Sequence, residues 1–264
     1  MERYVIRGGQ AGYDRLQLLA RDRWPDTRAL LTRAGVAAGM RCVDLGCGGG
    51  EVTFELAQLV APDGAVVGID MDEAKLALAR TAAAARGITN VEFRALNVNA
   101  WDEPATYDVV FSRFLLQHLR QPVALLRRMW AAVRPSGVIV VEDADFDGWG
   151  CHPANDGFAF FLRTYREVLA RWGGDHAIGR KLYGYFLDAG IPDAHVVLVT
   201  PLTIADEGKT LPLSTLEATA EAIRAEAIAS EDQLNTALKD LAAFTAEPHS
   251  LIFGPRIFQL WWQR

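Results

Sequence analysis

Short apolar runs alternate with longer segments of helical spacing along most of the 264 residues of this chain. Continuous apolar runs are typical of strands buried on both faces, as in parallel sheets. The alternation therefore predicts an α/β fold, a doubly wound sheet with helices on both faces. The expected strands are a run that ends at Leu45 and residues 65–70, 91–97, 107–113, 138–147, 195–202 and 257–262.

The N-terminal region, residues 1–40, precedes the first expected strand and has the pattern of a helical cap. Gly8-Gly9 breaks its start, and Pro25 is expected to open a second helix that stops at Gly35. Two helices ahead of the sheet are therefore predicted.

A second helical region, residues 148–250, leaves the sheet after the fifth expected strand. Its aromatic residues recur at helical spacing, which is typical of core and could also line an apolar pocket. Ser214-x-x-Glu217 and Ser230-x-x-Gln233 are capping boxes, so two helices should begin there. The expected division of the chain is a helical cap (1–40), a sheet core (41–147), a helical lid with the sixth strand (148–250) and the last strand (251–264).

Composition narrows the class of protein. Half of the residues are hydrophobic and 23% are charged, so a sizeable core is expected. The net charge of −6 disfavours binding to nucleic acid, whose phosphates attract basic surfaces. The start of the chain does not resemble a signal peptide, and no apolar stretch approaches the ~18 residues of a membrane span. The three cysteines lack metal-ligand spacing and indicate reduced thiols. We expect a cytoplasmic monomer or homodimer without a bound metal.

The stretch from Val43 to Glu51 carries the most specific chemistry. The first apolar strand carries an acid, Asp44, one residue before its end at Leu45, and glycines follow at positions 46, 48, 49 and 50 before a helical pattern begins. Glycines permit a sharp turn against a ligand, and a helix N-terminus presents free N–H groups. A dinucleotide fingerprint would need its third glycine at position 51, which is Glu51. A dehydrogenase is therefore disfavoured.

Residues 43–50, Val-Asp-Leu-Gly-Cys-Gly-Gly-Gly, resemble the first motif of class I S-adenosylmethionine-dependent methyltransferases. Bacterial small-molecule methyltransferases are the nearest group. The resemblance implies a Rossmann-like seven-stranded sheet of order 3-2-1-4-5-7-6 with an antiparallel last strand, and S-adenosylmethionine as cofactor in residues 41–147. Asp44 would face the ammonium of the cofactor, and Gly46, Gly48 and Gly50 would let the backbone approach it.

Asp70 ends the second expected strand, twenty residues beyond Gly50. A carboxylate at this place can accept hydrogen bonds from both ribose hydroxyls. The alternative is that Asp70 caps the following helix, a position for which Asp72 is better suited. Met71, beside Asp70, is also predicted to contact the cofactor.

The third and fourth expected strands end in further candidate contacts. In the resembled family an acid near Asn97 meets the adenine; the Asn97 carbonyl can accept the same bond and the Val98 N–H can donate one, with Asn99 as an alternative. After the fourth strand, the backbone of Arg113 and Phe114 is placed to hold the methionine ammonium.

Closing residues and a general base are the remaining candidates. Helices ahead of the first strand fold over the cofactor in similar enzymes, which makes Tyr4, Tyr13 and Arg15 candidates; packing or solvation is the plainer interpretation. His118 could accept a proton from a hydroxyl or amine, or could be a packed histidine.

The fifth strand runs into four carboxylates between positions 142 and 147. A metal site of oxygen ligands would need a further acid after the fourth strand, and residues 112–119 contain none. Asp143 or Asp145 is better interpreted as a base or substrate anchor, and Asp147 as a solvated side chain.

These features together predict an enzyme that moves a methyl group to a small, apolar or aromatic metabolite. The alternative is a protein of the same fold that binds the cofactor and performs non-methylating chemistry, such as a cyclisation. A nucleic-acid methyltransferase is disfavoured by charge and by the absence of an Asn/Asp-Pro-Pro-Tyr motif after the fourth strand.

Overall fold

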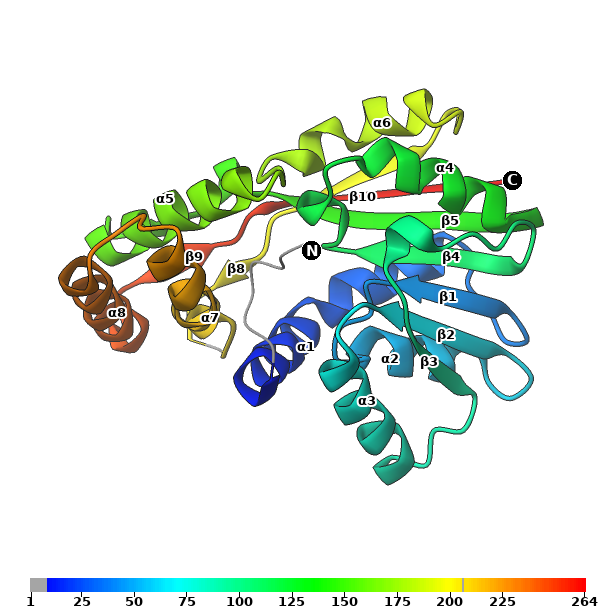
Figure 1. Ribbon diagram of the computed structural model, residues 1–264, viewed down its shortest axis with the longest axis horizontal. Coiled ribbons are helices and arrows are strands. Elements are labelled where there is room, and N and C mark those ends of the chain that lie inside the picture. Colours follow the sequence, from blue (N-terminus) through cyan, green and yellow to red (C-terminus); the bar gives the residue numbers. More distant parts are fainter. Residues whose placement is uncertain (1–8, 206) are drawn as a thin grey trace.

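The large sheet dominates the computed structural model, which describes residues 9–205 and 207–264, with side chains from residue 12 onward (Figure 1). Its order is β3-β2-β1-β4-β5-β10-β7, and β10 is antiparallel to both of its neighbours. Counted along the chain within this sheet, the order is 3-2-1-4-5-7-6, which confirms the predicted fold. The strands are β1 (Arg41–Leu45), β2 (Ala65–Asp70), β3 (Val91–Ala95), β4 (Tyr107–Arg113), β5 (Val133–Asp145), β7 (His195–Val199) and β10 (Arg256–Gln263).

Helices cover both faces of this sheet. On one face, α1, α2 and α3 pack over apolar side chains such as Phe111 and Val140. On the other face, α4 and α6 cover the alternate positions, such as Leu45 and Val141. The central strands β1, β4 and β5 are largely apolar on both faces because both faces are buried, whereas the edge strands β3 and β7 are partly exposed. The helices are α1 (Gly9–Arg33), α2 (Glu51–Val60), α3 (Glu73–Ala85), α4 (Pro122–Ala132), α5 (Asp156–Arg171), α6 (Leu182–Asp188), α7 (Leu211–Ala225) and α8 (Glu231–Ala246).

The prediction of two N-terminal helices was wrong, because α1 is continuous and contains Pro25. An interior proline removes one backbone hydrogen bond and usually kinks a helix. Here Leu30 and Leu31 are fully buried beyond the proline and Ala20 is buried before it, so both halves are fixed by packing. Tertiary contacts of this kind outweigh local propensity.

One of the two predicted capping boxes is present. Ser230 and Gln233 form a reciprocal box at the start of α8, as expected. The prediction for Ser214 was wrong: α7 begins at Leu211, and the Ser214 hydroxyl donates to the Leu211 carbonyl within the helix. Pro212 occupies the first turn of α7, where the missing N–H costs nothing.

A second, three-stranded sheet of order β6-β9-β8 was not predicted. Pro201 ends the region expected as one strand over 195–202, so β7 stays in the large sheet and the following residues turn into the small one. Gly254-Pro255 divides the last segment in the same way. Beside this sheet lie α5, α7 and α8 (Figure 1). The strands are β6 (Gly150–His152), β8 (Leu202–Thr203) and β9 (Leu251–Phe253).

Short 3-10 turns connect several of these elements. Two of them, η2 and η3, follow the carboxyl ends of β4 and β5, where candidate site residues were predicted. The turns are η1 (Val98–Ala100), η2 (Leu116–His118), η3 (Phe146–Gly148), η4 (Ile178–Lys181) and η5 (Glu207–Thr210).

Candidate functional site

The glycine loop, residues 46–50, joins β1 to α2 at the carboxyl edge of the sheet. Gly46, Gly48 and Gly50 have φ of +74°, +55° and +82°, which L side chains rarely adopt. The N–H groups of Gly46 and Cys47 donate to the carbonyl of Ile69 at 2.8 and 3.0 Å. The backbone conformation of the loop thus requires glycine at these three positions, and the hydrogen bonds to β2 hold the loop in place.

Protein side chains fill the space beside the glycines. A Cβ on Gly48 would lie 3.0 Å from Leu16 Cδ1, and one on Gly49 would lie 2.9 Å from the Tyr13 ring. Gly50 meets Phe93 in the same way, at 2.8 Å. The missing Cβ atoms therefore make room for α1 and for Phe93. This requirement is additional to the close approach of a ligand that the sequence suggested.

Two acids stand at the ends of β1 and β2 and line the cavity beside this loop. Asp44 is buried and accepts a hydrogen bond from Thr53 Oγ1 at 2.7 Å; burial raises its pKa to about 6. Asp70 accepts bonds from the backbone N–H groups of Gly48 and Asp72, both at 2.9 Å. Asp72 caps α3, accepting from the N–H groups of residues 74 and 75. The capping role considered for Asp70 therefore belongs to Asp72.

A polar row crosses the same face of the sheet at its carboxyl edge. It runs from Asp44 on β1 through Arg113 on β4 and Glu142 on β5. The Thr27 hydroxyl of α1 donates to Glu142 Oε2 at 2.9 Å and accepts from an Arg113 guanidinium nitrogen at 3.1 Å. Burial raises the pKa of Glu142 and lowers that of Arg113. The row places charge of both signs in a desolvated site.

The segment after β4 forms another wall of the cavity. Phe114 has a φ of +53°, unusual for a residue with a side chain, and its N–H donates to the Glu142 carbonyl at 2.8 Å. His118 also lines the cavity. Burial lowers the pKa of His118 to about 3, and the charges of Arg15 and Lys75 add to this effect. Its imidazole is therefore neutral at pH 7.

Asp143, the other predicted catalytic residue, is fully buried and does not line the cavity. Its carboxylate accepts from the N–H groups of Gln117 at 3.2 Å and Ala144 at 2.9 Å. Burial raises the pKa of Asp143 to about 7. In this position Asp143 holds η2 against β5, so that it fixes Gln117 and His118 from behind.

The remaining acids of the 142–147 run, Asp145 and Asp147, form ion pairs with arginines. Asp145 is fully buried and pairs with Arg180 and Arg256, and Asp147 pairs with Arg180 and Arg166. Neither lines the cavity. Across residues 9–205 and 207–264, no three His, Cys, Asp or Glu side chains gather in a group that could hold a metal ion.

Several predicted cofactor contacts lie outside the lining of this cavity. The Asn97 side chain accepts from the Asn99 N–H at 2.9 Å and caps η1, and Val98 is buried in the apolar core. Met71 is 48% exposed, whereas Tyr13 is buried against the glycine loop. Tyr4 lies outside the described residues. The candidates that the structure brings together on the cavity are Arg15, Asp44, Gly46, Gly48, Asp70, Arg113, Phe114 and His118.

Aromatic side chains line the half of the cavity away from the glycine loop. Phe146 and Tyr165 stack with ring centroids 4.8 Å apart, and Trp149 lies beside Phe146 at 5.2 Å. Of the aromatic residues on α5, Tyr165 reaches the cavity, while Phe158 and Phe161 belong to the apolar core. Of these aromatic lining residues, α5 thus contributes Tyr165, and the segment that follows β5 contributes Phe146 and Trp149.

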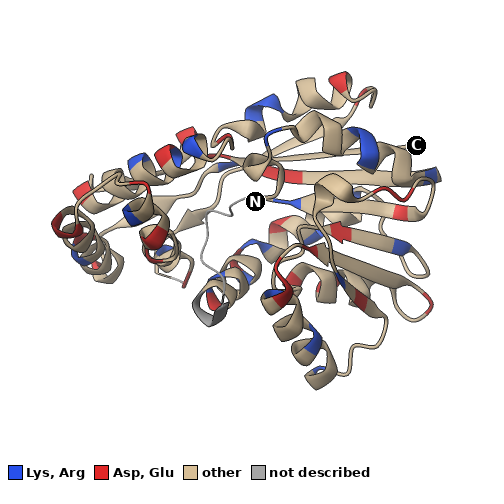
Figure 2. Cartoon of the chain, in the orientation of Figure 1, with Lys and Arg blue, Asp and Glu red and all other residues tan. Residues whose placement is uncertain are grey.

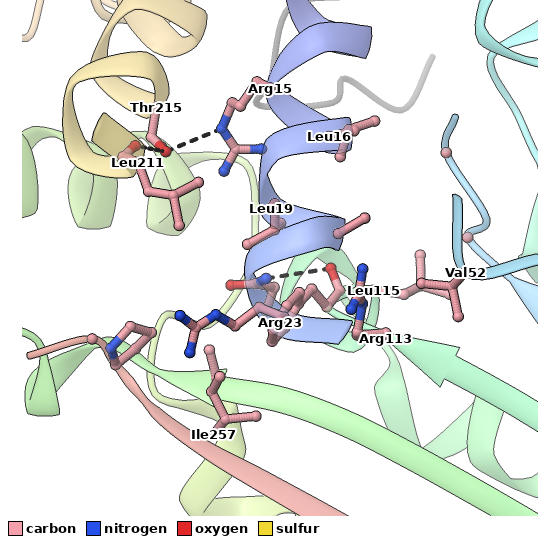
Figure 3. A pocket seen from close by; sticks show the side chains of 18 of the residues that line it. Arg15, Leu16, Leu19, Arg23, Val52, Arg113, Leu115, Leu211, Thr215 and Ile257 are labelled. Carbon is pink, nitrogen blue, oxygen red and sulfur yellow. Dashed lines mark hydrogen bonds between the residues drawn. The ribbon is translucent and has the colours of Figure 1, made fainter. Parts of the chain in front are cut away.

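Distant segments complete the cavity, and sequence spacing did not indicate them. Arg15 of α1 reaches across to α7, where its Nε donates to Thr215 Oγ1 at 3.0 Å (Figure 3). Arg23 and Arg113 lie on the opposite side of the cavity from the Arg15–Thr215 hydrogen bond (Figure 3). Only tertiary structure brings these parts together. The lining residues that the sequence did not single out include Leu19, Arg23, Gln117, Phe146, Trp149, Thr203, Thr215, Ile252 and Ile257.

The outer surface carries both signs of charge. Acidic and basic segments are interspersed over the helices (Figure 2). Of the helices in the described part of the chain, none has both the length and the apolar character needed to cross a bilayer.

Comparison with known proteins identifies the family that this chain matches. A family model described as a methyltransferase domain matches residues 37–171. Over 107 residues the chain is 38% identical to the ubiquinone biosynthesis O-methyltransferase of Acinetobacter baumannii (strain ACICU), covering 40% of this chain and 44% of that protein. The chain therefore matches less than half the length of such curated relatives.

Solved structures share the fold at lower identity. A protein from Bacillus halodurans C-125, provisionally named a methyltransferase, superposes with a TM-score of 0.61 at 16% identity, over 90% of this chain and 98% of that one. The [4+2]-cyclase SpnF superposes with a TM-score of 0.56 at 17% identity, over 93% and 81% of the two chains. At these identities the likeness shows the fold alone.

Proposed function

Because this chain belongs to the S-adenosylmethionine-dependent methyltransferase domain family, we propose that it methylates a small, apolar or aromatic molecule. One observation carries the proposal. The acids beside the glycine loop and the aromatic side chains of Phe146, Trp149 and Tyr165 line a single cavity. Cofactor and acceptor would therefore meet without an intervening wall.

The polar groups of the glycine-loop half suit S-adenosylmethionine, the methyl donor of this family. A carboxylate has about four lone-pair sites, and Asp70 uses two of them for backbone N–H groups. The other two would accept from the ribose hydroxyls. Asp44 lines the same half and would face the ammonium. When bound, the cofactor supplies a methyl group already activated by its sulfonium, so the protein contributes mainly positioning.

The aromatic half suits a flat or apolar acceptor that carries at least one polar group. Trp149 Nε1 and Gln117 Oε1 are buried, and neither has a hydrogen-bond partner among the described residues. Unpaired polar atoms in an apolar wall disfavour an all-carbon ligand. Both residues line the cavity, and an acceptor hydroxyl or amine that reached these atoms would supply the missing partners and have its orientation fixed.

Proton removal limits which acceptor is suitable. His118 is the cavity residue proposed as general base, but a base with a pKa of about 3 takes a proton poorly near pH 7. Asp143 is separated from the cavity. This favours an acceptor that ionises readily, such as an acidic phenol, over an alcohol. A pH profile of single turnover in His118→Gln would show whether the imidazole participates.

An acceptor screen tests the proposal. Calorimetry with S-adenosylmethionine, S-adenosylhomocysteine and NAD first establishes the cofactor, and release of S-adenosylhomocysteine then reports turnover with phenols, amines and aliphatic acids. Trp149→Phe, which keeps the ring and removes the N–H, should lower kcat/KM for the accepted compound roughly tenfold. The same variant should leave the affinity for S-adenosylhomocysteine unchanged. Turnover only with nucleic acid or protein would refute the proposal.

Non-methylating chemistry on the same fold is the second candidate. It is compatible with the fold that the chain shares with a [4+2]-cyclase. Mass spectrometry separates the two candidates. A methyl transfer raises the mass of the acceptor by one methylene and releases S-adenosylhomocysteine, whereas a cyclisation changes neither the mass of the acceptor nor the cofactor.

A further inference from the structure

One continuous segment, residues 195–204, forms a free edge of both sheets. β7 is the last strand of the large sheet and β8 is the last strand of the small one, and only two residues separate them. Within residues 9–205 and 207–264, β7 pairs with β10 alone and β8 with β9 alone. Each strand therefore presents a side with no strand beside it, and such a side pairs readily with another strand.

The side chains of this edge segment alternate between two environments. From position 197 onward the odd positions are buried or half-buried, and Pro201 and Thr203 line the cavity. The even positions face solvent, although most of them are apolar. Phe253 lies directly opposite Leu202 in the ladder and so shares its face. The apolar stripe, whose members are each between 40% and 60% exposed, consists of Val196, Leu198, Leu202, Ile204 and Phe253.

The edge segment lacks the devices that keep edge strands apart. Residues 195–204 contain no Lys, Arg, Asp or Glu, and their one proline, Pro201, lies between the two strands. The opposite edge of the large sheet differs, because β3 carries Glu92 and Arg94, which form an ion pair at 2.7 Å. Charged side chains on an edge strand oppose pairing with another chain. The large sheet thus has one protected edge and one that is open to a partner.

We propose that the edge segment is the interface with a second copy of this chain, paired antiparallel through β7 about a two-fold axis. A two-fold axis brings the same surface of both copies together, so the apolar stripe meets itself and no charge of the segment is buried. The two seven-stranded sheets would then continue into each other. A lipid surface suits the segment less well, because the segment has no lysine or arginine and the net charge of the chain is −6.

The area of this surface fits a dimer. The apolar stripe exposes on the order of 400 Å² per copy, which is about half of the ~800 Å² that each partner contributes to a stable interface. The backbone edge of β7 and helix α6 can supply the rest. Val196 pairs with Leu260, which belongs to the apolar core that α6 covers, so the stripe and α6 share one face of the sheet. On α6, Tyr183 and Leu187 are exposed.

Sedimentation velocity of the full chain over a dilution series tests the proposal. The wild type should sediment as a reversible dimer with twice the mass of the chain. Leu198→Lys places a charge close to the same charge of the second copy and should raise the dimer Kd by ~100-fold or more. Leu198→Ala removes apolar contact alone and should raise the Kd less, by roughly tenfold.

Met71→Lys is the matched control, because Met71 is also an exposed apolar residue but lies outside the edge segment. This variant should keep the wild-type Kd. Hydrogen exchange then locates the interface in the wild type. The amides of β7 should exchange more slowly as the protein concentration rises, whereas those of β3, at the opposite edge, should not change.

Several results would overturn the proposal. One is a wild type that stays monomeric at every concentration, and another is a dimer whose Kd is the same in Leu198→Lys. Open-ended oligomers would also contradict it, because a two-fold contact closes after two copies. Should Leu198→Lys fail to fold, the exchange measurement on the wild type still decides, since protection confined to amides outside residues 195–204 would exclude this interface. None of these results bears on methyl transfer, which is tested separately.

Discussion

Asp70 gives the sharpest test of the cofactor half of the cavity. Each oxygen of its carboxylate already accepts one backbone N–H at 2.9 Å, from Gly48 and from Asp72. The same side chain is therefore expected to hold the glycine loop and to accept the ribose hydroxyls. Asp70→Ala removes both functions at once, so stability and affinity should fall together.

The magnitudes follow from the hydrogen bonds that this substitution removes. Without the charged acceptor, S-adenosylhomocysteine should bind more weakly by roughly 1–3 kcal/mol, or about 5- to 150-fold. The two backbone N–H groups also lose their partner, which should lower the free energy of unfolding by a further ~1–3 kcal/mol. Asp70→Glu keeps the charge and should be milder in both measurements.

Calorimetry and denaturant unfolding without ligand measure the two effects separately. Asp72→Ala is the matched control, because Asp72 caps α3 and keeps its backbone N–H bond to Asp70. It should lose roughly 1–3 kcal/mol of stability through the cap and the ion pair with buried Lys75, and keep its affinity within about twofold. If Asp72→Ala weakens binding more than Asp70→Ala does, the ribose contact has been placed on the wrong acid.

Three further predictions concern stability. Gly48→Ala should lower the free energy of unfolding by ~1–2 kcal/mol because of the positive φ, and by a further amount because the new Cβ clashes with α1. Gly35→Ala is the control: Gly35 has φ +79° and open space around it, so only the cost of the positive φ should appear. Equal losses of stability in the two variants would contradict the packing argument. Because His118 has a pKa of about 3 when folded against 6.5 ordinarily, the unfolded chain binds more protons between those values and stability should fall as the pH drops through them. His118→Gln should flatten this slope, measured by denaturant unfolding at each pH. Asp145→Asn removes a fully buried carboxylate from two arginines whose side chains are 41% and 40% exposed, and should cost ~1–3 kcal/mol in thermal unfolding; an unchanged Tm would refute that role.

The large sheet could be predicted because its information is local. The central strands are largely apolar runs, and β1, β2 and β4 are each followed by a turn and a helix. Predictions from local sequence were wrong where tertiary packing decides the structure. Pro25 reads as a helix start, yet the burial of Leu30 and Leu31 keeps α1 continuous across it. Ser214 reads as a cap, but Pro212 already occupies the first turn of α7.

The residues of the site also divide into those that local sequence could place and those that it could not. Asp44, the glycine loop and Asp70 lie within one strand–turn–helix–strand unit, and their places follow from spacing. Trp149 and Thr215 come from separate parts of the chain, and only the folded structure brings them to one cavity. The lowered pKa of His118 could not be predicted from the sequence either, because it depends on the residues packed around the imidazole.

The position of β10 bears on how the chain folds during synthesis. β10 lies between β5 and β7 and pairs with both, although it follows both along the chain. Until it emerges from the ribosome, β5 presents an open edge, and β7 has no partner in the large sheet. Open edges recruit other strands and promote aggregation. A nascent chain that lacks β10 therefore exposes the edge of β5 and leaves β7 unpaired, so the large sheet is completed only when the last strand is available.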